Sequence, residues 1–242
     1  MTEEVQAPKI PRYSFSQWEN YDGCPQRWKF KSIMKLPSSP PGPAAARGLD
    51  MHDRCDKFIT NQIGENQLMY GSPSMRFGDK KPAVIAEKYV PILQEFRDHP
   101  NGAKHAEYKI GFDEEWYLCG GLSSKAKVIM VLDAVRAIEG VCHIGEWKSG
   151  KPKPTHGDQR KLYAMAGIKA WMAETTIVTT YYLEDTAPPE RLVVRDTAWP
   201  KLVMLWDDRF DRMARDKICA PKPGNHCNWC DYARAKGGPC TF

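Results

Sequence analysis

Residues 128–148 read VIMVLDAVRAIEGVCHIGEWK, and this stretch decides the fold. Two apolar runs rich in β-branched residues flank the pair Glu139-Gly140, which is typical of a tight turn. We therefore predict a β-hairpin whose strands cover about residues 127–138 and 141–148.

Each predicted strand carries a carboxylate at a position where a buried strand normally has an apolar side chain: Asp133 in the first and Glu146 in the second. Paired strands could bring both carboxylates to one divalent cation, which prefers oxygen ligands. Lys148 lies two residues after Glu146 and therefore on the same face of its strand. A cation held by Asp and Glu beside a Lys suits phosphodiester hydrolysis. The alternative is an ordinary hairpin with a surface Glu/Lys pair, and these three residues alone would favour it.

The composition is that of a globular protein with one sizeable core: 242 residues, 42% hydrophobic and 27% charged. A net charge of +5 fits a polyanionic partner, or merely a soluble surface. The first residues lack the basic and apolar regions of a secretory signal, and no apolar run is long enough to span a membrane. We expect a cytoplasmic protein, in which the eight cysteines are metal ligands or buried thiols rather than disulfides.

The remaining patterns predict helices and strands in mixed order. The capping box Ser16-Gln17-Trp18-Glu19 predicts a first helix, with a break near Gly23-Cys24-Pro25. Helices are predicted over 44–63, 83–96, 157–172 and 199–217, and further strands over 104–111, 115–119, 175–183 and 191–195. We expect one α/β domain with a mixed sheet flanked by helices and a cysteine-bearing lobe.

Further residues join the hairpin. His52 lies on the second helix, Gln159 and Tyr163 lie one turn apart on the helix after the hairpin, and Cys24 precedes a proline. The tail contains Cys227-Asn-Trp-Cys230 and then Cys240. In this order, from about Ser14 to Cys240, the residues resemble the RecB-like branch of the PD-(D/E)XK nuclease superfamily. The likeness is to members with an iron–sulfur cluster, namely the AddB-type nuclease domain and CRISPR-associated or phage exonucleases.

The resemblance implies a restriction-endonuclease-like core over about 83–217. Residues 14–64 and 219–240 would form a lobe that joins the two ends of a single nuclease domain covering 1–242. It also implies that His52, Asp133, Glu146 and the Trp147 carbonyl bind Mg²⁺ or Mn²⁺, with Lys148 assisting the water nucleophile. Gln159 and Tyr163 would line the site and touch the DNA backbone. The alternatives are a core histidine at position 52 and ordinary helix packing at positions 159 and 163.

The same resemblance implies a [4Fe–4S] cluster on Cys24, Cys227, Cys230 and Cys240, since four thiolates suit either such a cluster or structural zinc. The spacing from Cys230 to Cys240 is longer than in the relatives, so His226 or Cys219 could take part in a zinc site instead. Cys55, Cys119 and Cys142 fall within predicted elements and are expected to be buried thiols.

Basic and aromatic residues suggest where a nucleic acid would bind. Lys151, Lys153, Arg160 and Lys161 follow Lys148 in the sequence and could track a phosphate backbone, although a solvated loop explains Lys151 and Lys153 equally well. Trp18, Trp28 and Trp229 are candidates for base stacking, but we expect at least two of them to pack in the core.

The function expected from these features is a metal-dependent DNA nuclease, specifically an exonuclease that acts on single strands or duplex ends. The alternative is a nucleic-acid-binding or assembly module of a recombination, repair or CRISPR-adaptation complex. A helicase or another protein of such a complex is the expected partner, because the chain has no P-loop motif. A redox sensor is a third reading, but the sequence offers no second cofactor.

Overall fold

A six-stranded mixed sheet lies at the centre of the molecule, with strand order β2-β1-β3-β4-β5-β6. The computed structural model describes residues 10, 12–78, 80–100, 105–121 and 123–242. The strands are β1 (Ala106–Phe112), β2 (Leu118–Gly120), β3 (Val128–Ile138), β4 (Val141–Lys148), β5 (Thr175–Tyr182) and β6 (Glu190–Arg195). Neighbouring strands are antiparallel except β4 and β5, which run parallel and are connected by a crossover helix.

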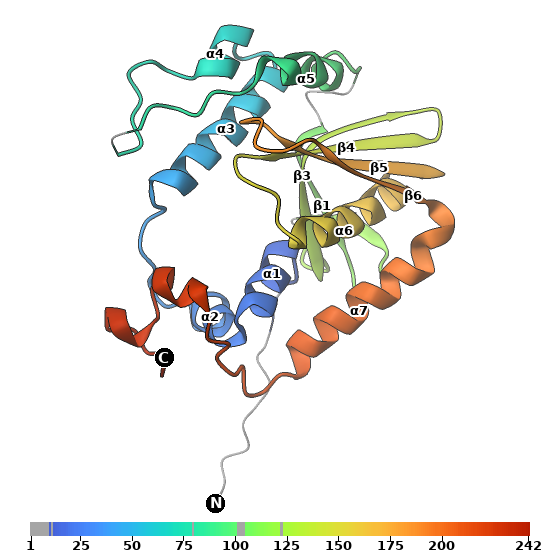
Figure 1. The fold of residues 1–242 in the computed structure, drawn as a ribbon. Coiled ribbons are helices and arrows are strands. Elements are labelled where there is room, and N and C mark those ends of the chain that lie inside the picture. The colour runs from blue at the N-terminus through green and yellow to red at the C-terminus, as the bar shows by residue number, and fades with distance from the viewer. Residues whose placement is uncertain (1–9, 11, 79, 101–104, 122) are drawn as a thin grey trace, which may run out of the picture.

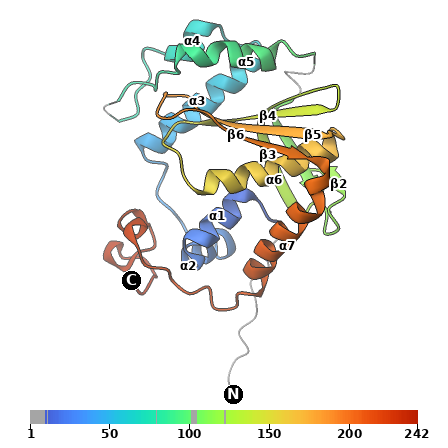
Figure 2. The same cartoon turned by 45° about the vertical axis from the view of Figure 1, so that its right-hand side comes forward.

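Helices cover both faces of this sheet (Figures 1 and 2). On one face lie α1, α6 and α7, and on the other α3, α4 and α5. Their bounds are α1 (Phe15–Gly23), α2 (Pro25–Trp28), α3 (Pro43–Ile59), α4 (Glu65–Tyr70), α5 (Val90–Arg97), α6 (Thr155–Ala170) and α7 (Trp199–Arg215). The predicted fold class, a mixed sheet flanked by helices, is confirmed.

Each face of the sheet has its own hydrophobic core. Leu132 and Ile144 of the sheet pack with Trp206 of α7 on one face. Trp147 packs with Phe58 of α3 and Leu93 of α5 on the other. The amphipathic pattern predicted for the last long helix is confirmed, since Leu202, Trp206, Phe210 and Met213 are all buried.

Two local expectations were wrong. The first helix is capped by Ser14 rather than Ser16, because the Ser14 side chain accepts a hydrogen bond from the Gln17 N–H. Residues 83–86 are not helical: the Ile85 N–H donates to Met69 and the Ala86 N–H to Leu183, so tertiary contacts satisfy this backbone. A short 3₁₀ turn, η2 (Glu87–Tyr89), then leads into α5.

The residues near both ends of the described chain pack together. We call residues 24–36 and 219–242 the cysteine lobe. Phe30 of the π-helix η1 (Lys29–Ile33) contacts the ring of Tyr232 edge-on, with centroids 5.6 Å apart. The Tyr232 hydroxyl donates to the Leu36 carbonyl, and the Lys222 N–H points to the Cys24 sulfur. The boundaries given above for the nuclease core (83–217) and for the lobe (14–64 and 219–240) remain predictions.

None of the helices in the described part of the chain is long and apolar enough to cross a membrane.

The crossover helix α6 packs closely on β5 because Gly167 has no side chain. A Cβ atom at position 167 would lie 2.3–2.9 Å from three atoms of the buried Thr176 side chain, closer than real contacts allow. This glycine therefore sets how near α6 lies to the sheet. By contrast, a Cβ at Gly157 of the same helix would meet nothing closer than 3.7 Å.

We expect Gly167→Ala to destabilise the protein by about 1–3 kcal/mol, although alanine is the better helix former, because overpacking against Thr176 outweighs helix propensity. Gly157→Ala is the matched control, and it should be neutral or stabilise by up to about 1 kcal/mol. Urea unfolding of both variants measures the two effects, and equal effects would contradict this account of α6.

Candidate active site

The hairpin carboxylate Asp133 lies at the point where β3 and β4 separate. Cα partners of the two strands run from Ile138 and Val141 to Ala134 and Gly145, and the pairing ends there. In place of a strand partner, the Trp147 N–H donates to Asp133 Oδ2 at 2.7 Å. Asp133 is 7% exposed, so this charge-assisted bond satisfies a buried carboxylate and a buried N–H together.

His52 reaches Asp133 from α3. Its Nδ1 lies 3.5 Å from Asp133 Oδ1. Gly48, one turn earlier on α3, lies against Ser149 just after β4: a Cβ at position 48 would lie 2.7 Å from the Ser149 hydroxyl, which can turn away, and 3.6 Å from the Ser149 Cβ. Burial lowers the pKa of His52, but the charges of Asp133 and Glu146 outweigh it and raise this pKa to about 9.

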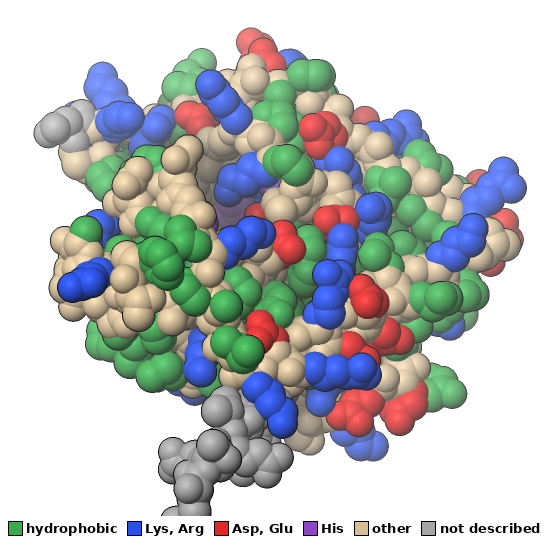
Figure 3. All heavy atoms as spheres, turned by 60° about the horizontal axis from the view of Figure 1, so that its bottom comes forward, with side chains coloured by type: hydrophobic (Ala, Val, Ile, Leu, Met, Phe, Trp, Pro, Cys, Tyr) green, Lys and Arg blue, Asp and Glu red, His purple; other side chains and the backbone are tan. Residues whose placement is uncertain are grey.

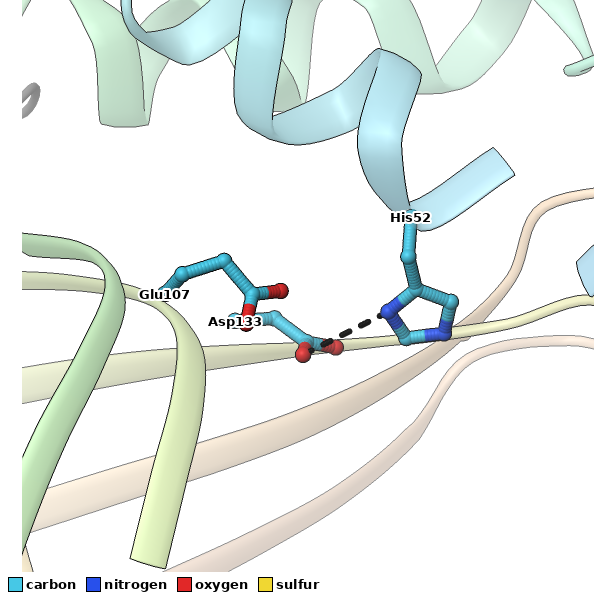
Figure 4. Close-up of side chains that lie close together, drawn as sticks. All are labelled: His52, Glu107 and Asp133. Carbon is cyan, nitrogen blue, oxygen red and sulfur yellow. Dashed lines mark ion pairs between the residues drawn. The ribbon is translucent and has the colours of Figure 1, made fainter. Parts of the chain in front are cut away.

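Glu107 is a third member of this group and was not foreseen from the sequence. One ligand atom each from His52, Glu107 and Asp133 lies within 4.8 Å of the others, and Figure 4 shows the three side chains converging. Glu107 is opposite Asp133 because its neighbours Ala106 and Tyr108 pair with Ala134 and Leu132. Only the register of β1 on β3 would have identified it.

The backbone of Glu107 is strained. Its φ is +47°, in the left-handed region that favours glycine. A left-handed conformation costs a non-glycine residue about 1–2 kcal/mol. Such strain is concentrated at functional sites. Burial first, and then the charge of Asp133, raise the pKa of Glu107, while His52 lowers it.

Glu146 is held by Lys148 and Gln159. Its Oε1 forms an ion pair with Lys148 and accepts from Gln159 Nε2 at 2.8 Å. Its Oε2 is buried and has no hydrogen-bond partner among the described residues. Burial first, and then Asp133, raise the pKa of Glu146 to about 7. A buried carboxylate with one oxygen unused is suited to a cation.

Gln159 and Tyr163 form a chain of hydrogen bonds that ends at Glu146. The Tyr163 hydroxyl donates to the Val131 carbonyl at 2.8 Å and accepts from Gln159 Nε2 at 3.1 Å. Both residues are at most 7% exposed. Their contacts in this structure therefore position Glu146, and the predicted contact with DNA stays a prediction.

The predicted basic residues fall into two groups. Lys151 and Lys153 line a cavity with Lys148 and His156. Arg160 instead pairs with Glu190 at 2.8 Å, and Lys161 pairs with Asp158 at 3.1 Å. Figure 3 shows a hollow with a histidine inside it and Lys or Arg side chains at its rim. The role of all four in binding nucleic acid stays a prediction.

The four predicted cluster ligands meet at one cavity. Cys24, Cys227, Cys230 and Cys240 line it together with His226, while Cys219 does not. Of the remaining cysteines, Cys55 and Cys142 are buried as expected. Cys119 is partly exposed, contrary to expectation, because the short strand β2 is at the edge of the sheet.

The tryptophans separate as expected. Trp18 and Trp28 are core residues, at 6% and 0% exposure, whereas Trp229 is 74% exposed. Of these three tryptophans, only Trp229 can stack on a nucleic-acid base without a rearrangement of the fold.

Solved structures with similar folds include a candidate exonuclease from Eubacterium rectale, with 14% identity and a TM-score of 0.48 over 91% of this chain and 87% of that one. SSO0001 has 13% identity and a TM-score of 0.40, over 96% and 87% of the two chains. LHK-Exo in complex with dAMP has 11% identity and a TM-score of 0.40, over 98% and 100%.

No curated protein sequence matches the chain. A family match does, and it extends over most of the sequence: residues 12–235 match the PD-(D/E)XK nuclease superfamily. This range contains His52, Asp133, Glu146 and Lys148, which meet at the end of the β3–β4 hairpin. The chain belongs to the PD-(D/E)XK nuclease superfamily.

Proposed function

We propose that the protein is a divalent-metal-dependent DNA nuclease, an exonuclease that hydrolyses phosphodiester bonds of single strands or duplex ends. The observation that carries this proposal is the Glu146 carboxylate, which is 3% exposed, held by Lys148 on one oxygen and unpartnered on the other. Together with Asp133 it gives the carboxylate pair and lysine expected of such an enzyme. DNA as the substrate and the exonuclease mode rest on the resemblance stated above.

The donor set fits Mg²⁺ or Mn²⁺. Two ligands on opposite sides of such an ion are about 4 Å apart, and one ligand atom each from His52, Glu107 and Asp133 lies within 4.8 Å of the others. The histidine nitrogen favours Mn²⁺ over a site made only of oxygens. Glu146 Oε2 and the Trp147 carbonyl are the further proposed ligands. The bound ion would polarise the phosphate and make its water more acidic.

Lys148 acts as a cation in this proposal. Burial lowers its pKa, but Glu146 and Asp133 outweigh this and raise the pKa of Lys148 above its usual value. A charged ammonium cannot accept a proton from water, so Lys148 orients the water and stabilises negative charge on the phosphate. Gln159 and Tyr163 keep Glu146 in place for this task.

Asp133→Asn and Glu146→Gln should abolish metal-dependent cleavage of end-labelled DNA. Asparagine keeps an acceptor for the Trp147 N–H, whereas Asp133→Ala leaves that buried donor unsatisfied at a cost of about 1–3 kcal/mol, so Asp133→Ala tests the fold as well. Asp208→Ala, which removes an exposed ion pair on α7, is the control. Full cleavage by either Asp133→Asn or Glu146→Gln would show that the proposed active site is wrong.

Lys148→Ala should lower kcat by about 10²–10³-fold, the usual loss for one preorganised donor, with little change in metal affinity. Single-turnover cleavage gives the rate, and Mn²⁺ titration gives the affinity. Loss of Mn²⁺ binding in Lys148→Ala would mean that its role is to hold the metal ligands.

Without divalent metal, Glu146 and His52 should make the folded protein less stable as pH rises, whereas burial lowers the pKa of His156 to about 4 and opposes this loss below pH 6.5. Burial and Asp133 raise the pKa of Glu146 from 4.5 to about 7, and carboxylates raise the pKa of His52 from 6.5 to about 9 against the effect of burial. A raised folded-state pKa gives stability that is complete below the unfolded pKa and is lost as pH rises through the folded pKa. The loss should therefore fall between pH 4.5 and about 9.

Mg²⁺ favours the deprotonated ligands, so its stabilising effect should grow over the same pH range. Melting temperatures measured across this range, with Mg²⁺ and with a chelator, test the prediction. His52→Asn should remove the part of the change that occurs at higher pH. A melting temperature that stays constant over this pH range in the presence of the chelator would contradict the prediction.

We also propose that Cys24, Cys227, Cys230 and Cys240 hold a [4Fe–4S] cluster, which would tie the two parts of the cysteine lobe together. The shared cavity and the N–H of Lys222 directed at Cys24 Sγ support this.

Anaerobically purified protein should be brown and contain about four irons per chain. Replacing any one of the four ligands by serine should remove the iron and lower the melting temperature. Cys119→Ser and Cys219→Ser should keep both, since neither residue lines the cavity. A colourless protein with one zinc, unaffected by Cys24→Ser, would overturn the cluster and leave the nuclease proposal intact.

A further inference from the structure

The cysteine lobe carries more than the whole net charge of the chain. Its two segments, 24–36 and 219–242, hold seven Lys and Arg residues and one acidic residue, Asp231. The resulting charge of +6 exceeds the net charge of +5 for all 242 residues. The remainder of the molecule is therefore close to neutral, and the positive field originates in the lobe.

These cations are not neutralised by neighbours. No carboxylate in the described part of the chain forms an ion pair with any of the seven, whereas thirteen Lys and Arg side chains elsewhere are in ion pairs. The Asp231 carboxylate accepts hydrogen bonds from the Ser39 N–H and the Ser39 hydroxyl. The exposed cations of the lobe are Lys31, Lys35, Lys222, Arg234 and Lys236. Unpaired surface cations in this number attract a polyanion.

The same lobe exposes an aromatic ring. Trp229, in the 3₁₀ turn η5 (Asn225–Trp229), is 74% exposed, although the flanking Cys227 and Cys230 face the cavity. An exposed indole among cations is the pairing by which single-stranded nucleic acids are held: bases stack on rings while lysines follow the phosphates. The lobe has no amphipathic helix that could lie on a membrane, since its described elements are turns and short helices.

The lobe also connects directly to the active site. It leads through residues 37–42 into α3, which carries His52 nine residues after Pro43, about 14 Å along the helix. In Figures 1 and 2 the C-terminal part of the lobe lies beyond the N-terminal end of α3. A strand longer than a few nucleotides could therefore contact both places.

We propose that the cysteine lobe is a binding surface for single-stranded nucleic acid outside the active site, with Trp229 as the stacking residue and the exposed lysines as phosphate contacts. Binding by the lobe does not require the proposed nuclease function. Only the statement that the bound strand is a substrate rests on that function.

Binding of a fluorescein-labelled thymidine 30-mer, followed by anisotropy without Mg²⁺ or Mn²⁺, tests this surface in the full chain. Trp229→Ala should weaken binding about five- to hundredfold, the range for loss of one base stack. Replacing Lys31, Lys35 and Lys236 by Gln should reduce the slope of log Kd against log salt by about 2, at roughly 0.7 per contact on a single strand.

Tyr117→Ala removes an aromatic ring that is 71% exposed on another part of the molecule, and Lys125→Gln with Lys201→Gln removes two exposed charges there. These controls should leave the affinity and slope unchanged. Melting temperatures equal to the unmodified protein's establish that all variants are folded.

Unchanged affinity in Trp229→Ala together with an unchanged slope in the lysine variant would overturn the inference. So would competition by polyglutamate or by anionic lipid vesicles as effective as that by the 30-mer. If binding depends on the lobe but no cleavage occurs with Mn²⁺, the inference stands and the proposed function fails. If the protein cleaves DNA but its binding does not depend on the lobe, the proposed function stands and the inference fails.

Discussion

The hydrogen bond from the Trp147 N–H to Asp133 is the interaction on which the rest of the site depends. It closes the gap where β3 and β4 stop pairing, and so lets two neighbouring strands separate inside a core without leaving a buried donor unsatisfied. The separation gives Glu146 its own space beside Lys148 and Gln159. The Asp133 carboxylate therefore has two roles: it ends the hydrogen-bond ladder between β3 and β4, and it faces His52 and Glu107.

The two halves of the site are supported by opposite faces of the sheet. His52 comes from α3, which packs over Trp147, while Gln159 and Tyr163 come from α6 on the other face. A close contact that sets the position of α6 is made at a glycine, Gly167 beside Thr176. The positions of the site residues thus depend on packing well outside the site, as preorganised sites generally require.

Local pattern was sufficient for the strands of the hairpin and for α7, because their periodicity and turn residues agree with the tertiary structure. It failed at residues 83–86, where the backbone bonds to Met69 and Leu183 override an apparent helix. Glu107 could not be found because its role depends on strand register and on a left-handed φ, neither of which a single sequence displays. The ion pair of Arg160 was hidden for the same reason, since Glu190 is remote in sequence.

The cysteine lobe has a consequence for the order in which the protein forms. Its contacts join residues about two hundred positions apart, such as Cys24 with Lys222 and Leu36 with Tyr232. Loops of this length close slowly, and a chain emerging from the ribosome cannot make these contacts until Lys222 and Tyr232 have been synthesised. The sheet and its helices can fold earlier. The nascent protein would then pass through a stage that has the carboxylate site but lacks the basic lobe.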